Sequence, residues 1–242
     1  MRSIAEQSVE ELGGSRSVLA LQKRDHVQLD QLLTQLSDAP TAAAQDDVLT
    51  RVNRLVFSHA FAEEAVLWPT LRRHLPDGEA LTLQVEQEHQ EVNELVTSLE
   101  RTGPDDPNRE RLLQRLVDVL RQDVRDEEDE LLPRLQQAVD VAELRRLGAY
   151  WLVIRRTAPT RPHPVVARRP PGNVLAALPL SAIDRSRDLL DHGARRAPGA
   201  VAPALQHASR ALAAVAGRAE RLGPFRRGEH ASTSRPATGS EA

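Results

Sequence analysis

The sequence contains no cysteine, and this absence excludes several kinds of chemistry. Disulfides, thiolate metal sites and cysteine nucleophiles cannot form without a thiol, and the absence fits a reducing compartment. No run of about 18 apolar residues occurs, so no membrane span is predicted. The N-terminal stretch MRSIAEQSVEELGG is acidic and lacks the apolar region of a signal peptide. We therefore expect a soluble, cytoplasmic protein with no membrane partner.

Aromatic residues are scarce as well: they make up 2% of the chain, whereas apolar residues make up 40%. The core must therefore consist of Leu, Val and Ala, with Trp68, Tyr150 and Trp151 as single large fillers. This composition favours helices over a β-sandwich, which would need more Val, Ile, Tyr and Phe. We predict an all-α fold.

The net charge of −3 conceals a division of the chain. Residues 1–156 carry 19 Lys and Arg against 29 Asp and Glu, a net charge of −10. Residues 157–242 carry 13 against 6, a net charge of +7. We therefore predict a helical unit over 1–156, a Pro-rich linker over 157–180, and a basic, partly helical and partly disordered segment over 181–242.

Breaker clusters divide the first unit into long stretches with helical apolar spacing. Long helices joined by short loops run antiparallel to their neighbours, so the pattern predicts an up-down-up-down four-helix bundle with its core in 17–140. Thr41 is a suitable N-cap. The predicted helices cover 17–36, 41–74, 79–101 and 107–139, and a shorter fifth helix covers 141–156.

The prolines of 157–180 favour extended chain. Beyond them, residues 181–192 and 201–222 have helical patterns, and residues 228–242 have the composition of a disordered tail. The opposite net charges favour docking of this segment on the acidic bundle. It has almost no aromatic residues and no recognisable module, so no nucleic-acid partner is expected. No chemistry is assigned to its histidines, His163, His192, His207 and His230.

Ionisable side chains interrupt the apolar stripe of each of the four helices near its middle. On folding these side chains should meet at one level of the bundle. Burial of each one without a partner would cost several kcal/mol. A pair of cations would satisfy imidazoles and carboxylates together. The six candidate metal ligands are His26, His59, Glu63, His89, Asp123 and Glu127.

The spacing assigns roles within this set. His59 and Glu63, like Asp123 and Glu127, are four residues apart and so share a helix face. Glu63 and Glu127 are the better candidates to bridge two metals, because one carboxylate has two oxygens. The adjacent Glu64 and Glu128 should point away from this face, and they are interpreted as surface or inter-helix charges.

An internal repeat supports the site. RDHVQLDQLLTQL around His26 parallels QEHQEVNELVTSL around His89. HAFAEEAVLWPTL from His59 parallels DVRDEEDELLPRL from Asp123, and Pro69 matches Pro133. Two similar helical hairpins would place their ligands about a pseudo-two-fold axis, which suits a two-metal centre.

The order His, HxxxE, His, xxxE, with a proline after each xxxE, resembles the hemerythrin-like HHE cation-binding family. The resemblance covers roughly residues 17–140. It implies a four-helix bundle of hemerythrin type that holds a non-haem di-iron centre of two iron ions. Members of the family bind dioxygen, store or sense iron or oxygen, or act on peroxide or nitric oxide. The ligand types also allow manganese or zinc.

Asp123 departs from the family pattern, which usually has a histidine at this position. A carboxylate adds negative charge where imidazole is neutral, so it should stabilise the ferric state and lower the reduction potential. We therefore expect oxygen or redox sensing, or peroxide removal of a catalase- or peroxidase-like kind, rather than reversible oxygen carriage. The alternative is a non-catalytic metal-storage or regulatory protein, and whether the chain is an enzyme stays open.

Overall fold

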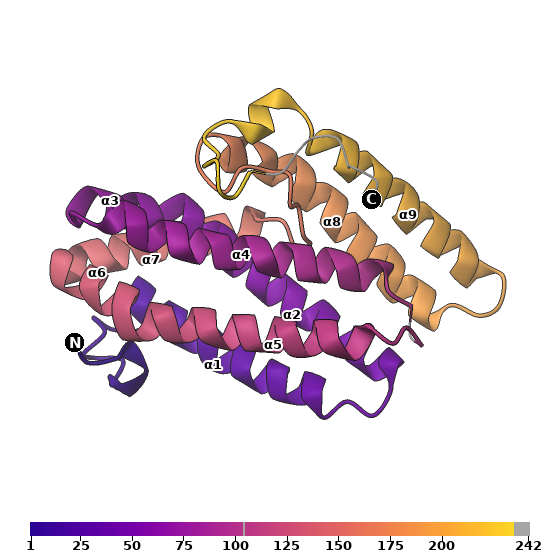
Figure 1. Cartoon of the computed structure of the whole chain (residues 1–242), viewed down its shortest axis with the longest axis horizontal. Helices are drawn as coiled ribbons and strands as arrows, with labels where there is room; N and C mark the ends of the chain where they lie inside the picture. The colour runs from indigo at the N-terminus through magenta and orange to yellow at the C-terminus, as the bar shows by residue number, and fades with distance from the viewer. Residues whose placement is uncertain (104, 235–242) are drawn as a thin grey trace.

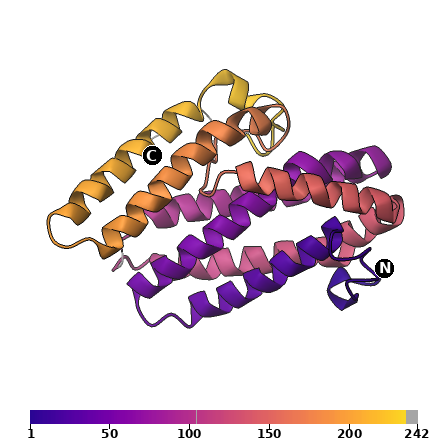
Figure 2. The same cartoon turned by 180° about the vertical axis from the view of Figure 1, so that it is seen from behind.

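The computed structural model describes residues 1–103 and 105–234, which contain many helices and no strand. Four long helices lie side by side (Figures 1 and 2). In this group α1 packs on α2, and α4 packs on α5. The predicted all-helical class is confirmed. The four helices are α1 (Val18–Ser37), α2 (Ala42–Ala62), α4 (Gly78–Arg101) and α5 (Arg109–Asp126).

Two hydroxyl side chains define where α1 and α2 begin. The hydroxyl of Ser17 accepts a bond from the backbone N–H of Leu19 at 3.3 Å. Thr41, predicted as an N-cap, accepts from the N–H of Ala44 at 3.2 Å. Each bond satisfies an amide that has no partner inside the helix.

The second and fourth predicted helices each contain one wider turn. After α2 comes the π-helical turn η2 (Glu63–Leu67) and then α3 (Trp68–His74); after α5 comes η3 (Glu127–Leu131) and then α6 (Leu132–Ala138). In η2 the N–H of Trp68 bonds to the carbonyl of Glu63, five residues back. Pro69 and Pro133 follow directly and have no N–H, so the α-helical ladder is already broken there.

The apolar core has two parts. One cluster fills the end of the four helices near the connection between α1 and α2, and it includes Leu33, Val52, Val96 and Leu116. The other surrounds Trp68, which is fully buried like Trp151. The polar residues that interrupt the stripes lie between the two clusters. They are therefore enclosed by apolar side chains on both sides.

The predicted fifth helix is α7 (Val141–Thr157), which packs on α1 and α2. Asp140 begins it by accepting from the N–H of Glu143 at 2.8 Å. Trp151 fills the core as expected, but Tyr150 is 55% exposed. The expectation that Tyr150 is a core residue is wrong, because it lies on the opposite face of α7.

Residues 172–180 of the predicted linker are helical. They begin α8 (Gly172–Arg196), which pairs with α9 (Val201–Ala219) in a hairpin ahead of a short turn, η4 (Gly223–Arg226). Pro179 was expected to prevent a helix here but lies inside α8. It is exposed, so water can satisfy the freed carbonyl, while Ala176 and Leu180 beside it on the helix are buried.

The basic segment lies against the acidic helices, as its charge leads us to expect (Figure 1). Arg195 of α8 pairs with Asp47 at 3.1 Å, and Asp188 accepts from Arg54 of α2 at 2.9 Å. Near the C-terminus, the side chain of Gln87 donates to Ser232 at 3.0 Å, within the 228–234 part of the segment for which disorder is predicted. The remainder of that prediction, 235–242, lies outside the described residues.

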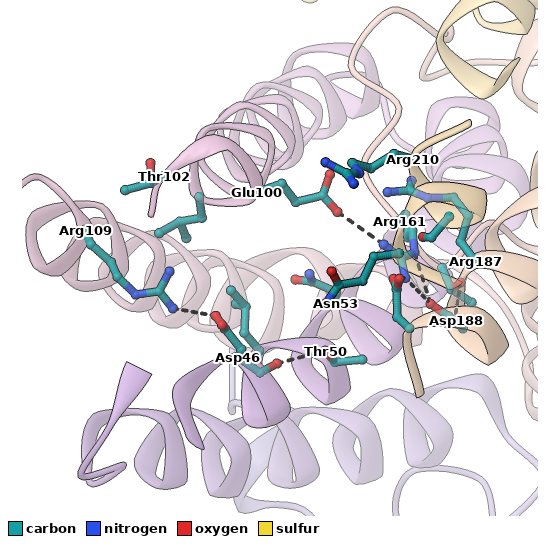
Figure 3. Close-up of a pocket in the computed structure, with 16 residues that line it drawn as sticks. Asp46, Thr50, Asn53, Glu100, Thr102, Arg109, Arg161, Arg187, Asp188 and Arg210 are labelled. Atoms are coloured by element: carbon teal, nitrogen blue, oxygen red, sulfur yellow. Dashed lines mark hydrogen bonds and ion pairs between the residues drawn. The ribbon is translucent and has the colours of Figure 1, made fainter. Parts of the chain in front are cut away.

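A polar cavity of about 460 Å³ separates part of the hairpin from α2 and α4. Figure 3 shows Glu100 of α4 directed toward Arg161, while Arg161 also reaches Asp188. Arginines and carboxylates both line this cavity. The contact between the two parts of the molecule is therefore largely ionic at this end.

Among the described residues, none of the helices is long and apolar enough to cross a membrane.

Candidate metal centre

All six predicted ligands converge between α1, α2, α4 and α5. Their atoms form two overlapping groups, and within each group the candidate ligand atoms lie within 4.8 Å of one another. All six side chains are buried except His59, which is partly buried. The first group is His26, His59, Glu63 and Glu127; the second is His89, Asp123 and Glu127.

Glu63 and Glu127 each face both groups. In Glu63, Oε1 lies 3.2 Å from Nε2 of His59, and Oε2 lies 3.5 Å from Nε2 of His89. In Glu127, Oε2 lies 3.1 Å from Nε2 of His26, and Oε1 lies 4.0 Å from Nε2 of His89. Each carboxylate therefore presents one oxygen to each group, as a bridge between two cations would.

The π-helical turns contribute to this placement. Glu63 begins η2 and Glu127 begins η3, so both bridging candidates stand where a helix widens. A wider turn changes the direction of the side chains that follow. Glu63 and the adjacent Glu64, the first two residues of η2, are both buried, at 0% and 2% exposure. Single π-helical turns of this kind are frequent at functional sites.

Three buried carboxylate oxygens in the cluster have no hydrogen-bond partner: Oε2 of Glu63, Oδ1 of Asp123 and Oε1 of Glu127. All three face Nε2 of His89, at 3.5, 3.7 and 4.0 Å. An unpaired buried carboxylate is costly, whereas coordination to a metal satisfies it. The arrangement of these oxygens and imidazole nitrogens fits a bound cation.

The pKa values of the cluster residues also fit a bound cation. Burial and the nearby charge of Glu63 raise the pKa of Glu127 well above its usual range. Burial and Glu127 do the same to the pKa of Asp123. Burial disfavours the charged form of His89, but Asp123 and the adjacent glutamates raise its pKa to about 9. The ionised forms of Asp123 and Glu127 are therefore unfavourable without a counter-charge, and a bound cation would stabilise them.

Each histidine of the cluster has a carboxylate next to Nδ1, the ring nitrogen that faces away from the other candidate ligands. Nδ1 of His26 lies 2.9 Å from Glu128, and Nδ1 of His89 lies 3.0 Å from Glu64. Of the two interpretations of Glu64 and Glu128, inter-helix charges is therefore the right one, and surface charges is not. Such partners orient the ring and leave Nε2 free for a metal.

His59 has the same arrangement, with a partner that the sequence reasoning missed. Oδ2 of Asp25 lies 3.4 Å from its Nδ1. Asp25 precedes His26 in the chain, and its repeat equivalent is Glu88, which precedes His89. The repeat therefore held a signal for this partner.

Four carboxylates contact residues of the cluster, and the internal repeat relates them in pairs: Glu64 with Glu128, and Asp25 with Glu88. Glu64 and Glu128 are equivalent and support the equivalent His89 and His26. Asp25 supports His59, and its equivalent Glu88 lies against Asp123, the residue equivalent to His59. Glu88 thus occupies the position of a histidine partner, but it faces a second carboxylate. Burial raises the pKa of Glu88, and its hydrogen bond with Asp123 opposes that rise.

The chain is similar to known proteins over the region that forms this centre. Residues 17–135 match the family described as the Hemerythrin HHE cation binding domain. The chain is also 25% identical over 134 residues to an uncharacterized hemerythrin-like protein of Schizosaccharomyces pombe. That match covers 55% of this chain and 66% of the relative, just under two thirds of its length. No solved structure matches this chain.

The matched region, the helices and the His/Glu cluster agree on the class of protein, an all-helical cation-binding protein. Residues 17–135 belong to the hemerythrin HHE cation-binding family, and the resemblance seen in the sequence is confirmed. The family description and the cluster together establish metal-cation binding as the function of this region.

Proposed function

We propose that this chain is a non-haem di-iron protein whose metals interact with dioxygen or peroxide. In this proposal residues 17–140 form an antiparallel up-down-up-down four-helix bundle within a unit of 1–156. His26 and His59 would hold one iron, His89 and Asp123 would hold the other, and Glu63 and Glu127 would be shared between them. The observation that carries the proposal is the division of the two oxygens of each glutamate between different histidines.

The space beside the centre supports a very small ligand. A cavity of about 20 Å³ borders His26, His59, His89 and Asp123. A cavity of this size holds about one water-sized molecule, so it suits dioxygen or peroxide and excludes a larger organic substrate. Leu29, Leu55, Val56 and Leu120 line its other walls.

A larger groove next to this cavity lies between α1 and α5. This groove of about 430 Å³ shares His26, Leu29, Leu120 and Val124 with the small cavity. Bound iron would supply an open coordination position and a change of valence for the ligand. The protein would hold the metals through Glu63 and Glu127, orient the imidazoles through their carboxylate partners, and exclude bulk water with the apolar walls.

Metal analysis of the purified full-length protein tests this proposal. We expect close to two irons per chain after anaerobic loading with Fe²⁺, and a change in the optical spectrum on exposure to oxygen. Wild-type protein that binds no iron stoichiometrically would exclude the di-iron assignment. Loading with Mn²⁺ or Zn²⁺ in parallel establishes whether the site prefers iron.

A second candidate is a regulatory or storage protein that binds metal without turnover. The ionic contacts between the C-terminal segment and the metal-binding helices favour it, because they could transmit a change at the centre. Stopped-flow mixing of the iron-loaded protein with hydrogen peroxide separates the two candidates. Rapid repeated consumption of peroxide indicates an enzyme, whereas binding without consumption indicates a sensor or a store.

A further inference from the structure

Two arginines from outside the family-matched residues reach the carboxylates that support the histidines. Arg168, in the segment between α7 and α8, lies 3.6 Å from Oε1 of Glu64. Arg155, in α7, donates to Asp25 and also to the hydroxyl of Ser58 at 3.3 Å. The matched region ends at residue 135. Part of the polar surroundings of the centre therefore comes from later in the chain.

Arg168 connects residues 158–234, called the C-terminal segment from here on, to the metal centre through a chain of three contacts. Its guanidinium is buried against Glu64, with 9% and 3% of the two side chains exposed. Glu64 in turn holds Nδ1 of His89 at 3.0 Å. Nε2 of His89 faces Glu63, Asp123 and Glu127. A cation from the C-terminal segment is thus separated from a proposed ligand by a single carboxylate.

Arg168 is itself held by the C-terminal segment. Its backbone N–H donates to Glu229, and its side chain donates to the carbonyl of His163 at 3.2 Å. The side chain of Asn173, at the start of α8, donates to the carbonyl of Arg168 at 2.9 Å. Displacement of this segment would therefore remove Arg168 from Glu64.

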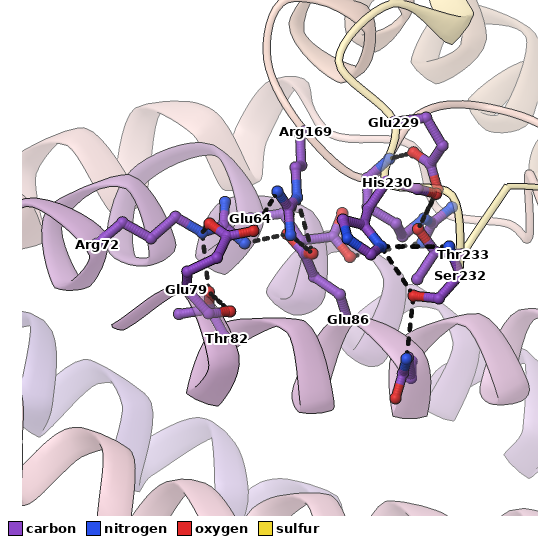
Figure 4. Close-up of polar contacts among 12 residues, drawn as sticks. Glu64, Arg72, Glu79, Thr82, Glu86, Arg169, Glu229, His230, Ser232 and Thr233 are labelled. Carbon is purple, nitrogen blue, oxygen red and sulfur yellow. Dashed lines mark hydrogen bonds and ion pairs between the residues drawn. The ribbon is translucent and has the colours of Figure 1, made fainter. Parts of the chain in front are cut away.

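The neighbouring Arg169 contacts the same face of the bundle but makes different contacts. It donates to Glu86 at 2.7 Å and to Glu79 at 2.7 Å, and both acceptors belong to α4 (Figure 4). Neither of these glutamates contacts a histidine of the cluster. Arg169 therefore attaches the segment to α4, whereas Arg168 reaches a carboxylate that positions a ligand.

We propose that Arg168 is a positioning residue of the metal centre, and that metal binding and docking of residues 158–234 stabilise each other through Arg168, Glu64 and His89. This inference rests on the proposed metal site. Coupling between two sites is reciprocal: if the docked segment increases metal affinity, the bound metal strengthens docking by the same factor. Typical couplings of this kind are about 5- to 150-fold.

The experiment uses the full-length chain with Fe²⁺ as the probe under anaerobic conditions. Hydrogen exchange of α8 and α9 is compared between metal-free and metal-loaded protein, and Fe²⁺ affinity is measured by titration. In the wild type we expect metal to slow exchange in the hairpin. Arg168→Gln should lower the affinity by about 5-fold, the lower end of typical couplings, because it acts through Glu64, and it should abolish the slowing.

Two variants serve as controls. Arg168→Lys keeps the positive charge and should retain most of the Fe²⁺ affinity. If Arg168 acted through packing alone, this variant would lose affinity as Arg168→Gln does. Arg195→Gln removes the exposed pair with Asp47, a docking contact with no path to a histidine, and should leave both readouts within about twofold of the wild type. Co²⁺ spectra of Arg168→Gln should also differ from those of the wild type, because the orientation of His89 changes.

The outcomes separate this proposal from the proposed function. If the wild type binds no metal, the metal site itself is wrong. If the wild type binds metal but exchange in α8 and α9 is the same with and without it, the coupling is wrong and the site stands. Wild-type affinity in Arg168→Gln would also overturn the coupling. The comparison of wild-type exchange remains decisive if Arg168→Gln does not fold.

Discussion

Oε1 of Glu64 lies 3.0 Å from Nδ1 of His89, on the opposite side of the imidazole from the cluster of Glu63, Asp123 and Glu127. The carboxylate therefore acts on the proposed metal through the ring. It selects which nitrogen carries the proton and leaves Nε2 as the free donor atom.

Substitution of Glu64 tests this relationship directly. Glu64→Gln removes the charge that strengthens His89 as a donor, so Fe²⁺ affinity should fall by about 10-fold. Anaerobic titration measures the change. Glu91→Gln, on the same helix as His89 but in an exposed pair with Arg115, is the matched control and should bind metal as the wild type does. Equal affinity for Glu64→Gln and the wild type would contradict the role of Glu64.

Substitution of a bridging glutamate should reduce the number of metals. In Glu127→Gln one of the two bridging carboxylates becomes an amide, which is a poor ligand, so we expect elemental analysis to give at most one iron per chain. Asp129→Asn, an exposed position in the same π-helical turn, is the control and should bind the wild-type amount. Two irons retained in Glu127→Gln would show that Glu127 is not required as a bridge.

Asp123→His tests why this position departs from the family pattern. The new imidazole would find Glu88 in the position of a partner carboxylate, so iron content should be retained. Loss of a negative charge at the metals should raise the reduction potential by about 60 mV or more, a tenfold change in a one-electron equilibrium. Spectroelectrochemistry measures it, with the exposed Asp118→His as control. An unchanged potential and spectrum would refute the role given to Asp123.

His163 should make the attachment of the α8–α9 hairpin to the segment before it dependent on pH. It is buried, with Asp184 at 3.0 Å from Nε2 and Glu220 at 2.9 Å from Nδ1. Burial disfavours its charged form, but these carboxylates outweigh that effect and raise its pKa to about 9. Because the folded pKa exceeds the unfolded value, the stabilisation is complete below about pH 6.5 and is lost as the pH rises through 9.

We therefore expect His163→Gln to destabilise the protein by up to about 3 kcal/mol near pH 6 and by progressively less toward pH 9.5. Urea unfolding at several pH values measures the difference. His192→Gln, at an exposed position of α8, should show no such trend. A destabilisation that does not change with pH would mean that His163 contributes by packing rather than by its charge.

Several side-chain orientations could not be predicted from the sequence. Glu64 and Glu128 were interpreted as surface or inter-helix charges, because a regular α-helix separates them from Glu63 and Glu127. In the structure each contacts a histidine on another helix, and no local spacing gives that partner. Similarly, His163 had no partner at helical spacing because Asp184 and Glu220 come from two different later helices.

The sequence by itself determined the helical class and the convergence of six ionisable groups, because helical periodicity places residues three or four apart on one face, and the repeat places two hairpins in register. Only the tertiary structure decided which nitrogen of each histidine faces the cluster, which carboxylates support the rings, and that Arg155 and Arg168 reach two of them. These contacts join residues far apart in the chain, and no local spacing encodes them.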